Sequence, residues 1–243
     1  MIRRGPSLKT IRAVFFDLDG TLRHSRPTND QALFEIACAM GLTRSDEQRR
    51  QLLRWGHYYW AQSDELNRDL AAFGMDMDGL LTNYVRRYVM ILGCEPERAT
   101  ALAPEMYRRL SETQLQKDWV PPEVPETLVK LQKAGLILAV VSNREKPLGD
   151  LLERLGLGLY FAFGLASCEV DSWKPDVRIF QRAAELAAVT PEQAMYVGDN
   201  YFTDALGARR AGLHPVLLDP EGVFPEADCP VIRSIRELAQ GLA

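Results

Sequence analysis

The sequence predicts an α/β fold, a doubly wound parallel sheet with an inserted helical domain. From about residue 121 onward, short apolar runs alternate with helical patterns, as expected for parallel strands that helices cover on both faces. A similar apolar run, Ala13–Phe16, stands far upstream. Between these regions, apolar residues recur at helical spacing without a clear strand. The simplest assembly places the upstream run in the later sheet and makes the intervening helices an insertion.

Acidic residues directly follow the upstream strand. Ala13–Phe16 is expected to be buried, and it leads into Asp17-Leu18-Asp19-Gly20-Thr21-Leu22. Ligands of open parallel sheets bind beyond the carboxyl ends of the strands, so Asp17 and Asp19 lie where chemistry is expected. Neighbouring carboxylates repel one another unless a cation or a shared proton relieves them. A hard dication that prefers oxygen ligands is the simplest relief.

The inserted segment is expected to be helical from about Thr28 to Gln116. Thr28-Asn29-Asp30-Gln31 fits a capping box at the start of its first helix, which Gly41 would end. Further helices are predicted from Ser45 and over residues 81–92 and 95–112. The links to the sheet are residues 23–27 and 118–125, and the prolines of the second link limit it to stiff, extended forms. The predicted domains are therefore residues 1–24 with 119–243, and residues 25–118.

The remaining segment supplies the other strands and the covering helices. Strands are predicted over residues 136–141, 160–165, 194–197 and 216–218, and helices over residues 126–134, 146–155, 175–188 and 202–211. Gly135 and Gly212 would stop two of these helices, and Pro175 fits the first turn of another. The ends of these strands bring further polar residues to the same edge of the sheet.

Composition excludes several classes of protein. The chain has 243 residues, 47% of them hydrophobic and 26% charged, as in an ordinary globular protein of one or two domains. A net charge of −4 argues against nucleic-acid binding, and no apolar run approaches the length of a membrane span. No apolar segment follows the basic Met1–Arg4, which argues against a secretory signal. The four cysteines form no CxxC pair, so we expect reduced, mostly buried thiols in a cytoplasmic protein. The oligomeric state is not predicted.

Four motifs occur in a fixed order at strand ends or helix starts. They are the pair Asp17 and Asp19, then Ser142-Asn143, then Lys174 before Pro175, and finally Asp199 followed by Asp204. This ordered set resembles the haloacid dehalogenase superfamily of aspartate-nucleophile hydrolases, in particular its phosphoglycolate phosphatase-like members. The resemblance implies a Rossmann-like core and a helical cap inserted between the first and second motifs.

The resemblance also implies roles for these residues. Asp17 would attack phosphorus to give an aspartyl-phosphate, and Asp19 would act as general acid and base. Mg²⁺ would bind Asp17, the backbone carbonyl of Asp19 and Asp199, with Asp204 supporting its water shell. The expected phosphate contacts are Thr21, the Ser142 hydroxyl, backbone N–H groups around Asn143, and Lys174.

Each motif alone also has a purely structural interpretation. An isolated Asp-x-Asp-Gly more often caps a turn, with Gly20 at positive φ, although an EF-hand is excluded by the residues at its sixth and twelfth positions. Ser142 fits a helix N-cap or a turn, and Lys174 fits a solvated surface. Asp199 would then lie in a turn and Asp204 on an exposed helix face.

The second aspartate decides the expected reaction. A halide leaves without protonation, whereas an alkoxide leaves poorly, so Asp19 favours hydrolysis of a small phosphate monoester over dehalogenation. The segment 28–116 contains no lysine, so the Schiff base of a phosphonatase has no source. A phosphomutase and a catalytically silent binding protein stay open as alternatives, and the identity of the ester is not predicted.

Two groups outside the motifs are candidates for substrate selection. The first is an aromatic cluster of the inserted segment, which fits a hydrophobic core or a ligand pocket: Trp55, His57, Tyr58, Tyr59 and Trp60. The second is Arg23, His24 and Arg26, just past the acidic loop. An arginine there fits a second anionic group of the substrate or a solvated hinge.

Overall fold

The structure is a computed structural model that describes residues 10–42, 45–113 and 117–240. It divides into two compact units. The sheet unit contains the described residues up to His24 and from Asp118 onward, and the helical unit is Ser25–Lys117. The expectations for Met1–Arg4 and for Gln116 lie outside the described residues.

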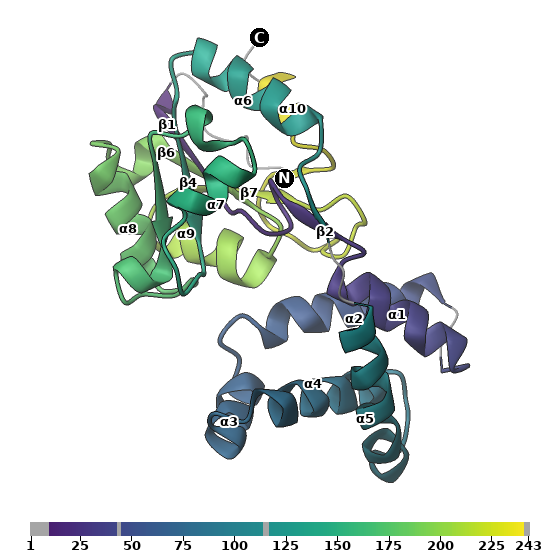
Figure 1. The fold of residues 1–243 in the computed structure, drawn as a ribbon. Coiled ribbons are helices and arrows are strands. Elements are labelled where there is room, and N and C mark those ends of the chain that lie inside the picture. Colours follow the sequence, from purple (N-terminus) through teal and green to yellow (C-terminus); the bar gives the residue numbers. More distant parts are fainter. Residues whose placement is uncertain (1–9, 43–44, 114–116, 241–243) are drawn as a thin grey trace. The chain divides into compact units, whose positions relative to one another are not determined.

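The sheet unit is built on a six-stranded sheet in the order β5-β4-β1-β6-β7-β8, and every pair of neighbours is parallel (Figure 1). Its strands are β1 Ala13–Phe16, β4 Ile137–Ser142, β5 Phe163–Ala166, β6 Ala194–Gly198, β7 His214–Leu218 and β8 Val231–Ile232. The predicted fold class is therefore confirmed, and β1 lies in the later sheet as expected. Strand β8 was not predicted, because two residues are too short to give a pattern.

Helices cover both faces of this sheet (Figure 1). Val14 and Phe16 pack under α6 Glu123–Lys133, α7 Gly149–Arg154 and α10 Glu237–Gln240. The alternate residues Ala13 and Phe15 pack under α8 Val177–Leu186 and α9 Leu206–Arg210. Because both faces of β1 are buried, the strand is apolar throughout rather than alternating.

Several elements of the sheet unit begin later than predicted, among them α7, which begins at Gly149 and not at residue 146. Gly158–Tyr160 forms a 3₁₀ turn, so β5 starts at Phe163. Tyr201–Ala205 forms a π-helical turn before α9 starts. Pro175 is not in the first turn of a helix, because Asp176 is the N-cap of α8 and its side chain accepts a hydrogen bond from the Arg178 N–H. Lys174 therefore lies in a loop, where its side chain is not committed to a helix face.

The links between the units differ from the prediction. Strands β2 His24–Arg26 and β3 Lys117–Trp119 pair in a two-stranded sheet, although no strand was predicted there. The expectation of an extended link over residues 118–125 was wrong, because α6 already begins at Glu123 and contains Pro125. Proline is tolerated in the first helical turn, where its missing N–H has no partner to lose.

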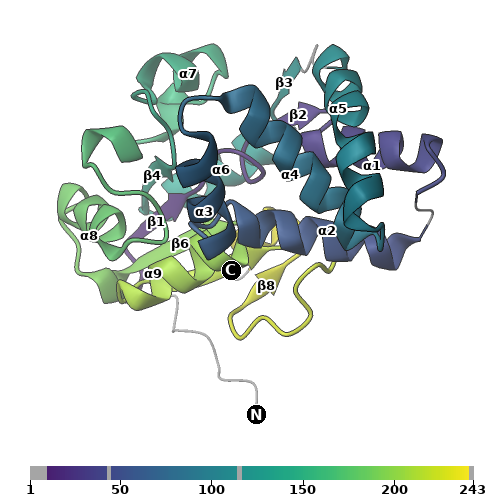
Figure 2. The same ribbon diagram turned by 90° about the horizontal axis from the view of Figure 1, so that it is seen from below.

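The helical unit contains five helices in the part that the structure describes: α1 Asn29–Ala39, α2 Asp46–Tyr59, α3 Asp64–Phe73, α4 Met77–Ile91 and α5 Pro96–Glu112. The predicted capping box of Thr28 and Gln31 is present, and α2, α3 and α4 also begin with a side-chain cap. Helix α3 was not predicted. Helix α4 packs along α5, against which α1 also packs, so the helices share one apolar core (Figure 2).

Part of the aromatic cluster, Trp55 and Tyr59, belongs to that core, whereas Tyr58 and Trp60 are exposed. Tyr59 is fully buried, and Trp55 stacks on Tyr84 with ring centroids 5.1 Å apart. Below the rings, the buried Asp69 accepts two hydrogen bonds of 2.7 Å from Arg87 and one of 2.9 Å from the Tyr59 hydroxyl. Burial opposes ionisation of Asp69, but these donors outweigh it and lower the pKa of Asp69. Asp69 is thus a buried anion that anchors α3 to α2 and α4.

The cysteines correct one expectation. None of the four is fully buried, and Cys168 is exposed. All four are free thiols, as predicted. Among the described residues, no helix is both long and apolar enough to cross a membrane.

Removing the partner of Asp69 should destabilise the helical unit. We expect Arg87→Met to lower the free energy of unfolding by about 2 kcal/mol, because a buried carboxylate would keep only the Tyr59 hydroxyl. The matched control is Arg98→Met, at an exposed position on α5, which should change stability by less than about 0.5 kcal/mol. Urea unfolding followed by circular dichroism measures both, and equal losses would contradict the assignment.

Candidate active site

The acidic loop is folded tightly against the end of a neighbouring strand. The Asp17 N–H donates to the Val197 carbonyl at 2.9 Å, which continues the pairing of β1 with β6. Gly20 has φ +85°, and a Cβ there would lie 2.2 Å from Asp199 Oδ2. Only glycine fits this position, because it has both the required backbone conformation and no side chain to collide with Asp199. The loop thereby brings Asp17 and Asp199 to the same point.

Lys174 holds the buried side of the site. Its side chain is 3% exposed, and Nζ donates to Asp17 Oδ1 and to Asp204 Oδ1, each at 2.7 Å. A third bond, of 2.9 Å, goes to the Tyr196 hydroxyl, which itself donates to the Val141 carbonyl at 2.7 Å. Burial alone would favour a neutral amine, but the two carboxylates outweigh it and raise the pKa of Lys174. Lys174 is therefore a buried ammonium and not a solvated lysine.

The side chain of Asn143 fixes the backbone that carries Lys174. Its Oδ1 accepts from the Lys174 N–H at 2.7 Å, and its Nδ2 donates to the Lys174 carbonyl at 3.0 Å. The Ser167 hydroxyl donates to the same Oδ1 at 2.8 Å. These bonds tie the end of β4 to the loop before α8, so Asn143 positions the lysine through its side chain.

Asp17, Asp199 and Asp204 form an acidic cluster. One oxygen of each lies within 4.8 Å of the others. Burial, opposed by Lys174, raises the pKa of Asp17 to about 6. Burial and the neighbouring carboxylates also raise the pKa of Asp199. Two buried carboxylates and the half-buried Asp199 lie beside a single ammonium, so a further cation would relieve the remaining repulsion.

The carboxylates of this cluster differ in what they already bind. Asp204 uses both oxygens, since Oδ1 accepts from Lys174 and Oδ2 accepts from the Asn200 N–H at 3.0 Å. Asp17 offers its second oxygen, for which no donor is found among the described residues, and Asp199 receives only a long bond of 3.4 Å from the Thr21 hydroxyl. This oxygen-only donor set fits a hard divalent cation at Asp17 and Asp199, with Asp204 in a supporting position.

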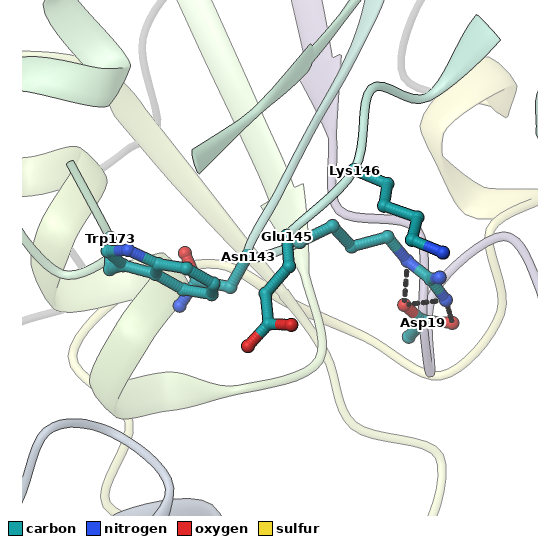
Figure 3. Close-up of a pocket in the computed structure, with 6 residues that line it drawn as sticks. Asp19, Asn143, Glu145, Lys146 and Trp173 are labelled. Carbon is teal, nitrogen blue, oxygen red and sulfur yellow. Dashed lines mark hydrogen bonds and ion pairs between the residues drawn. The ribbon is translucent and has the colours of Figure 1, made fainter. Parts of the chain in front are cut away.

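Asp19 points in a different direction from Asp17. Its side chain is 38% exposed and lines a cavity of about 470 Å³ together with Asn143, Arg144, Glu145, Lys146 and Trp173 (Figure 3). Arg144 donates from Nε and Nη2 to its two oxygens at 2.7–2.9 Å. Arg23 binds Asp19 from the other side at 2.5 Å and also pairs with Asp118. One carboxylate is thus buried in the acidic cluster, and the other faces an open cavity.

Two of the remaining predicted residues, Thr21 and Ser142, lie at the same edge of the sheet. Thr21 is buried beside Asp199, and Ser142 is buried at the end of β4. Arg23 forms ion pairs within the sheet unit, and the His24 ring packs on Trp119 at 5.7 Å. Arg26 lies exposed in β2.

Two residues of the site were not predicted. Tyr196 lies two residues before Gly198 on a buried strand, where a tyrosine hydroxyl needs a polar partner, and this burial is the signal that would have indicated it. Arg144 directly follows Asn143 at a strand end, so its position indicates the site edge although its partner could not be read from the sequence.

The comparisons with known proteins assign the family. Residues 11–212 match the family model of haloacid dehalogenase-like hydrolases. The chain belongs to this family of hydrolases, as the ordered motifs predicted.

Individual relatives agree with this assignment. Haloacid dehalogenase-like hydrolase domain-containing protein 3 of Homo sapiens is 34% identical over 226 residues, which covers 92% of this chain and 86% of the relative. The phosphoserine phosphatase of Thermus thermophilus is 30% identical over 238 residues, covering 89% and 91%. The crystal structure of 2-haloacid dehalogenase from Pseudomonas syringae pv. Tomato DC3000 superposes with a TM-score of 0.55 at 27% identity, covering 96% of this chain and 98% of that chain. Phosphatases and a dehalogenase are thus both among the similar proteins.

Replacing the buried ammonium should destabilise the protein in a pH-dependent way. We expect Lys174→Met to lower the free energy of unfolding by about 3 kcal/mol near pH 8, because Asp17 and Asp204 would repel each other without a counter-charge. Near pH 5 the loss should be smaller, since a carboxylate with a raised pKa takes up a proton in the folded state and the repulsion disappears. Urea unfolding at both pH values measures the difference.

Two further variants control this experiment. Adding Asp204→Asn to Lys174→Met should restore part of the loss near pH 8, since it removes one of the repelling charges. Lys133→Met, at an exposed position at the end of α6, should leave stability unchanged at both pH values. A loss of equal size at both pH values would refute the electrostatic account.

Proposed function

We propose that the protein is a Mg²⁺-dependent phosphatase that hydrolyses a small phosphate monoester through an aspartyl-phosphate. The observation that carries this proposal is the different surroundings of two aspartates only two residues apart. Asp17 lies in the buried acidic cluster beside Lys174, and Asp19 faces the cavity. This arrangement suits a nucleophile on one side of a reacting phosphate and an acid and base on the side of the leaving group.

The proposed reaction has two steps. A carboxylate oxygen of Asp17 attacks phosphorus, the bond from phosphorus to the ester oxygen breaks, and Asp19 delivers a proton to the departing alkoxide. Asp19 then removes a proton from water, whose oxygen attacks the phosphorus of the aspartyl-phosphate. Inorganic phosphate and the regenerated Asp17 carboxylate are the products.

Other residues of the site would hold the phosphate. Lys174 places a positive charge 2.7 Å from Asp17, which offsets the repulsion between this carboxylate and an anionic substrate. The Ser142 and Thr21 hydroxyls and the backbone N–H groups around Asn143 lie at the same edge of the sheet and are the proposed phosphate donors. Positioning and charge neutralisation are the main needs of phosphoryl transfer, and these groups supply both.

The residues present fit a magnesium ion. Asp17, Asp199 and the backbone carbonyl of Asp19 would hold it, with Asp204 in support. Burial is the main cause of the raised pKa values of Asp17 and Asp199, and a bound dication would favour the ionised forms of both. When bound, the ion supplies positive charge that stabilises the oxygens of the transferring phosphoryl group.

The position of Asp19 also favours a phosphatase over a dehalogenase. The similarity to a phosphoserine phosphatase supports phosphatase activity. The similarity to a dehalogenase of known structure supports dehalogenation as the alternative reaction of the same fold. Halide release needs no proton donor, so an acid facing the cavity favours an alkoxide leaving group. A phosphomutase would use the same acidic pair and is the second candidate.

The helical unit is the proposed cap. It is inserted between the first and second motifs and is joined to the sheet unit by the paired strands β2 and β3. A cap of this kind would exclude water and select the leaving group. Four free thiols support a reducing compartment, and we propose the cytoplasm.

Substitution of each aspartate should block a different step. Asp17→Asn should form no covalent intermediate, because an amide is not a nucleophile. Asp19→Asn should lower kcat by about 10²- to 10⁴-fold and accumulate phospho-enzyme when the leaving group is good, because its breakdown lacks a base. Rapid-quench labelling with ³²P-phosphate esters measures both.

The matched control for these variants is Asp150→Asn, an exposed carboxylate on α7. It should keep wild-type kcat and labelling. Stable label on Asp17→Asn would refute the nucleophile, and chloride release from 2-chloropropionate without hydrolysis of any phosphate ester would identify a dehalogenase instead.

Magnesium binding should strengthen as the pH rises. Protons and Mg²⁺ compete for the same carboxylates, and burial raises the pKa of Asp17 to about 6. We therefore expect weaker stabilisation by Mg²⁺ near pH 5 than near pH 7.5, and loss of turnover in excess chelator. Thermal unfolding across a Mg²⁺ titration at each pH measures the affinity. Affinity that does not change with pH, or full turnover in chelator, would count against this metal site.

A further inference from the structure

The cavity beside Asp19 is lined by Arg144, Lys146 and Glu145, three charged residues that the proposed chemistry does not use. All six of its lining residues belong to the sheet unit, and its volume of about 470 Å³ is in the range of small-molecule sites. Asp19, the proposed proton donor to the leaving group, lies at one end. Since the acid must contact the leaving-group oxygen, a leaving group that meets Asp19 lies at the border of this cavity.

Arg144 has hydrogen-bonding capacity to spare in this cavity. Its Nε and Nη2 hold Asp19, but among the described residues none accepts a hydrogen bond from Nη1. A guanidinium has five N–H donors, and the two on Nη1 are therefore available to a ligand.

Lys146 adds a second positive charge at the same end. Its side chain reaches toward the ion pair of Asp19 with Arg144, whereas the carboxylate of Glu145 points away from that pair (Figure 3). Within the described part of the chain, Lys146 forms no ion pair or hydrogen bond. Arg144 and the flexible Lys146 are neighbouring cations whose N–H donors can bind an anionic group of a ligand.

We propose that Arg144 and Lys146 bind a second anionic group on the leaving group, so that the substrate is a small phosphate ester carrying a carboxylate or another phosphate. This inference rests on the proposed phosphatase activity. The second anion would accept hydrogen bonds from Nη1 of Arg144 and from Lys146. It would also compete with Asp19 for the positive charge of the Arg144 guanidinium. Binding of the correct substrate would thereby weaken the ion pair that holds the Asp19 carboxylate, which acts on the leaving group.

The test compares pairs of esters that differ only in the second anionic group. Phosphoglycolate and its carboxamide form the carboxylate pair, and propane-1,3-diol bisphosphate and 3-hydroxypropyl phosphate form the phosphate pair. p-Nitrophenyl phosphate has no second anion and reports the hydrolysis alone. We expect the wild-type protein to prefer the anionic member of at least one pair by about 10-fold or more in kcat/KM. The pair that shows the preference identifies the anion.

Two variants connect that preference to the cavity. Lys146→Gln and Arg144→Gln should each reduce the selectivity ratio toward one, with the loss for Lys146→Gln mainly in KM. Arg144→Lys keeps the positive charge and should therefore keep part of the wild-type selectivity ratio. It replaces Arg144→Gln in the comparison if that variant folds poorly. Lys133→Gln, an exposed lysine at the end of α6, is the matched control and should keep the wild-type ratio.

The outcomes separate this inference from the proposed function. Hydrolysis of p-nitrophenyl phosphate without preference in either pair would overturn the inference and leave the phosphatase standing. A wild-type preference that survives in Lys146→Gln and Arg144→Gln would also overturn it. Failure to hydrolyse any of the five esters would refute the phosphatase itself.

Discussion

One buried ammonium makes the rest of this site possible. Lys174 Nζ lies 2.7 Å from both Asp17 and Asp204, in surroundings where an uncompensated carboxylate would be strongly disfavoured. The lysine must therefore be held accurately, and much of the local structure does this. Asn143 clamps its backbone on both sides, and the Tyr196 hydroxyl gives the ammonium a third acceptor. These contacts join residues from the ends of β1 and β4, from strand β6, from the π-helical turn Tyr201–Ala205 and from the loop that carries Lys174.

The site holds one ammonium for three clustered carboxylates, so its negative charge exceeds its positive charge. Lys174 bonds two of the three clustered carboxylates, and the raised pKa values of Asp17 and Asp199 come mainly from burial, to which repulsion between the carboxylates adds. A protein of this kind gives up folding stability to keep an acidic site ready for a cation. Gly20 belongs to the same compromise, because its missing side chain lets Asp199 approach the acidic loop.

The sequence allowed prediction of those parts that depend on chain order. Parallel strands bring their carboxyl ends to one edge of the sheet, so the sequence alone predicts that Asp17, Ser142 and Asp199 lie close together. The capping box at Thr28 was also predictable, because it depends on residues three positions apart. The conformation of the links between the two units was not predictable, because proline fits both an extended chain and the first turn of a helix. Pro125 lies in the first turn of α6. The short strands β2, β3 and β8 leave no pattern to detect.

Side-chain contacts across the sheet are the part that sequence patterns could not supply. Arg144 and Asp19 are 125 positions apart, and their ion pair depends on how far a long side chain reaches over the end of the sheet. Asp17 and Asp19 have the same chemistry, yet the first faces the buried cluster and the second faces a cavity that Arg144, Glu145 and Lys146 also line. The separate roles proposed for them therefore rest on surroundings that distant segments build. In the proposed reaction the acidic cluster meets only the phosphate, so we infer that recognition of the rest of a substrate comes from residues such as Arg144 and Lys146, which the motifs do not include.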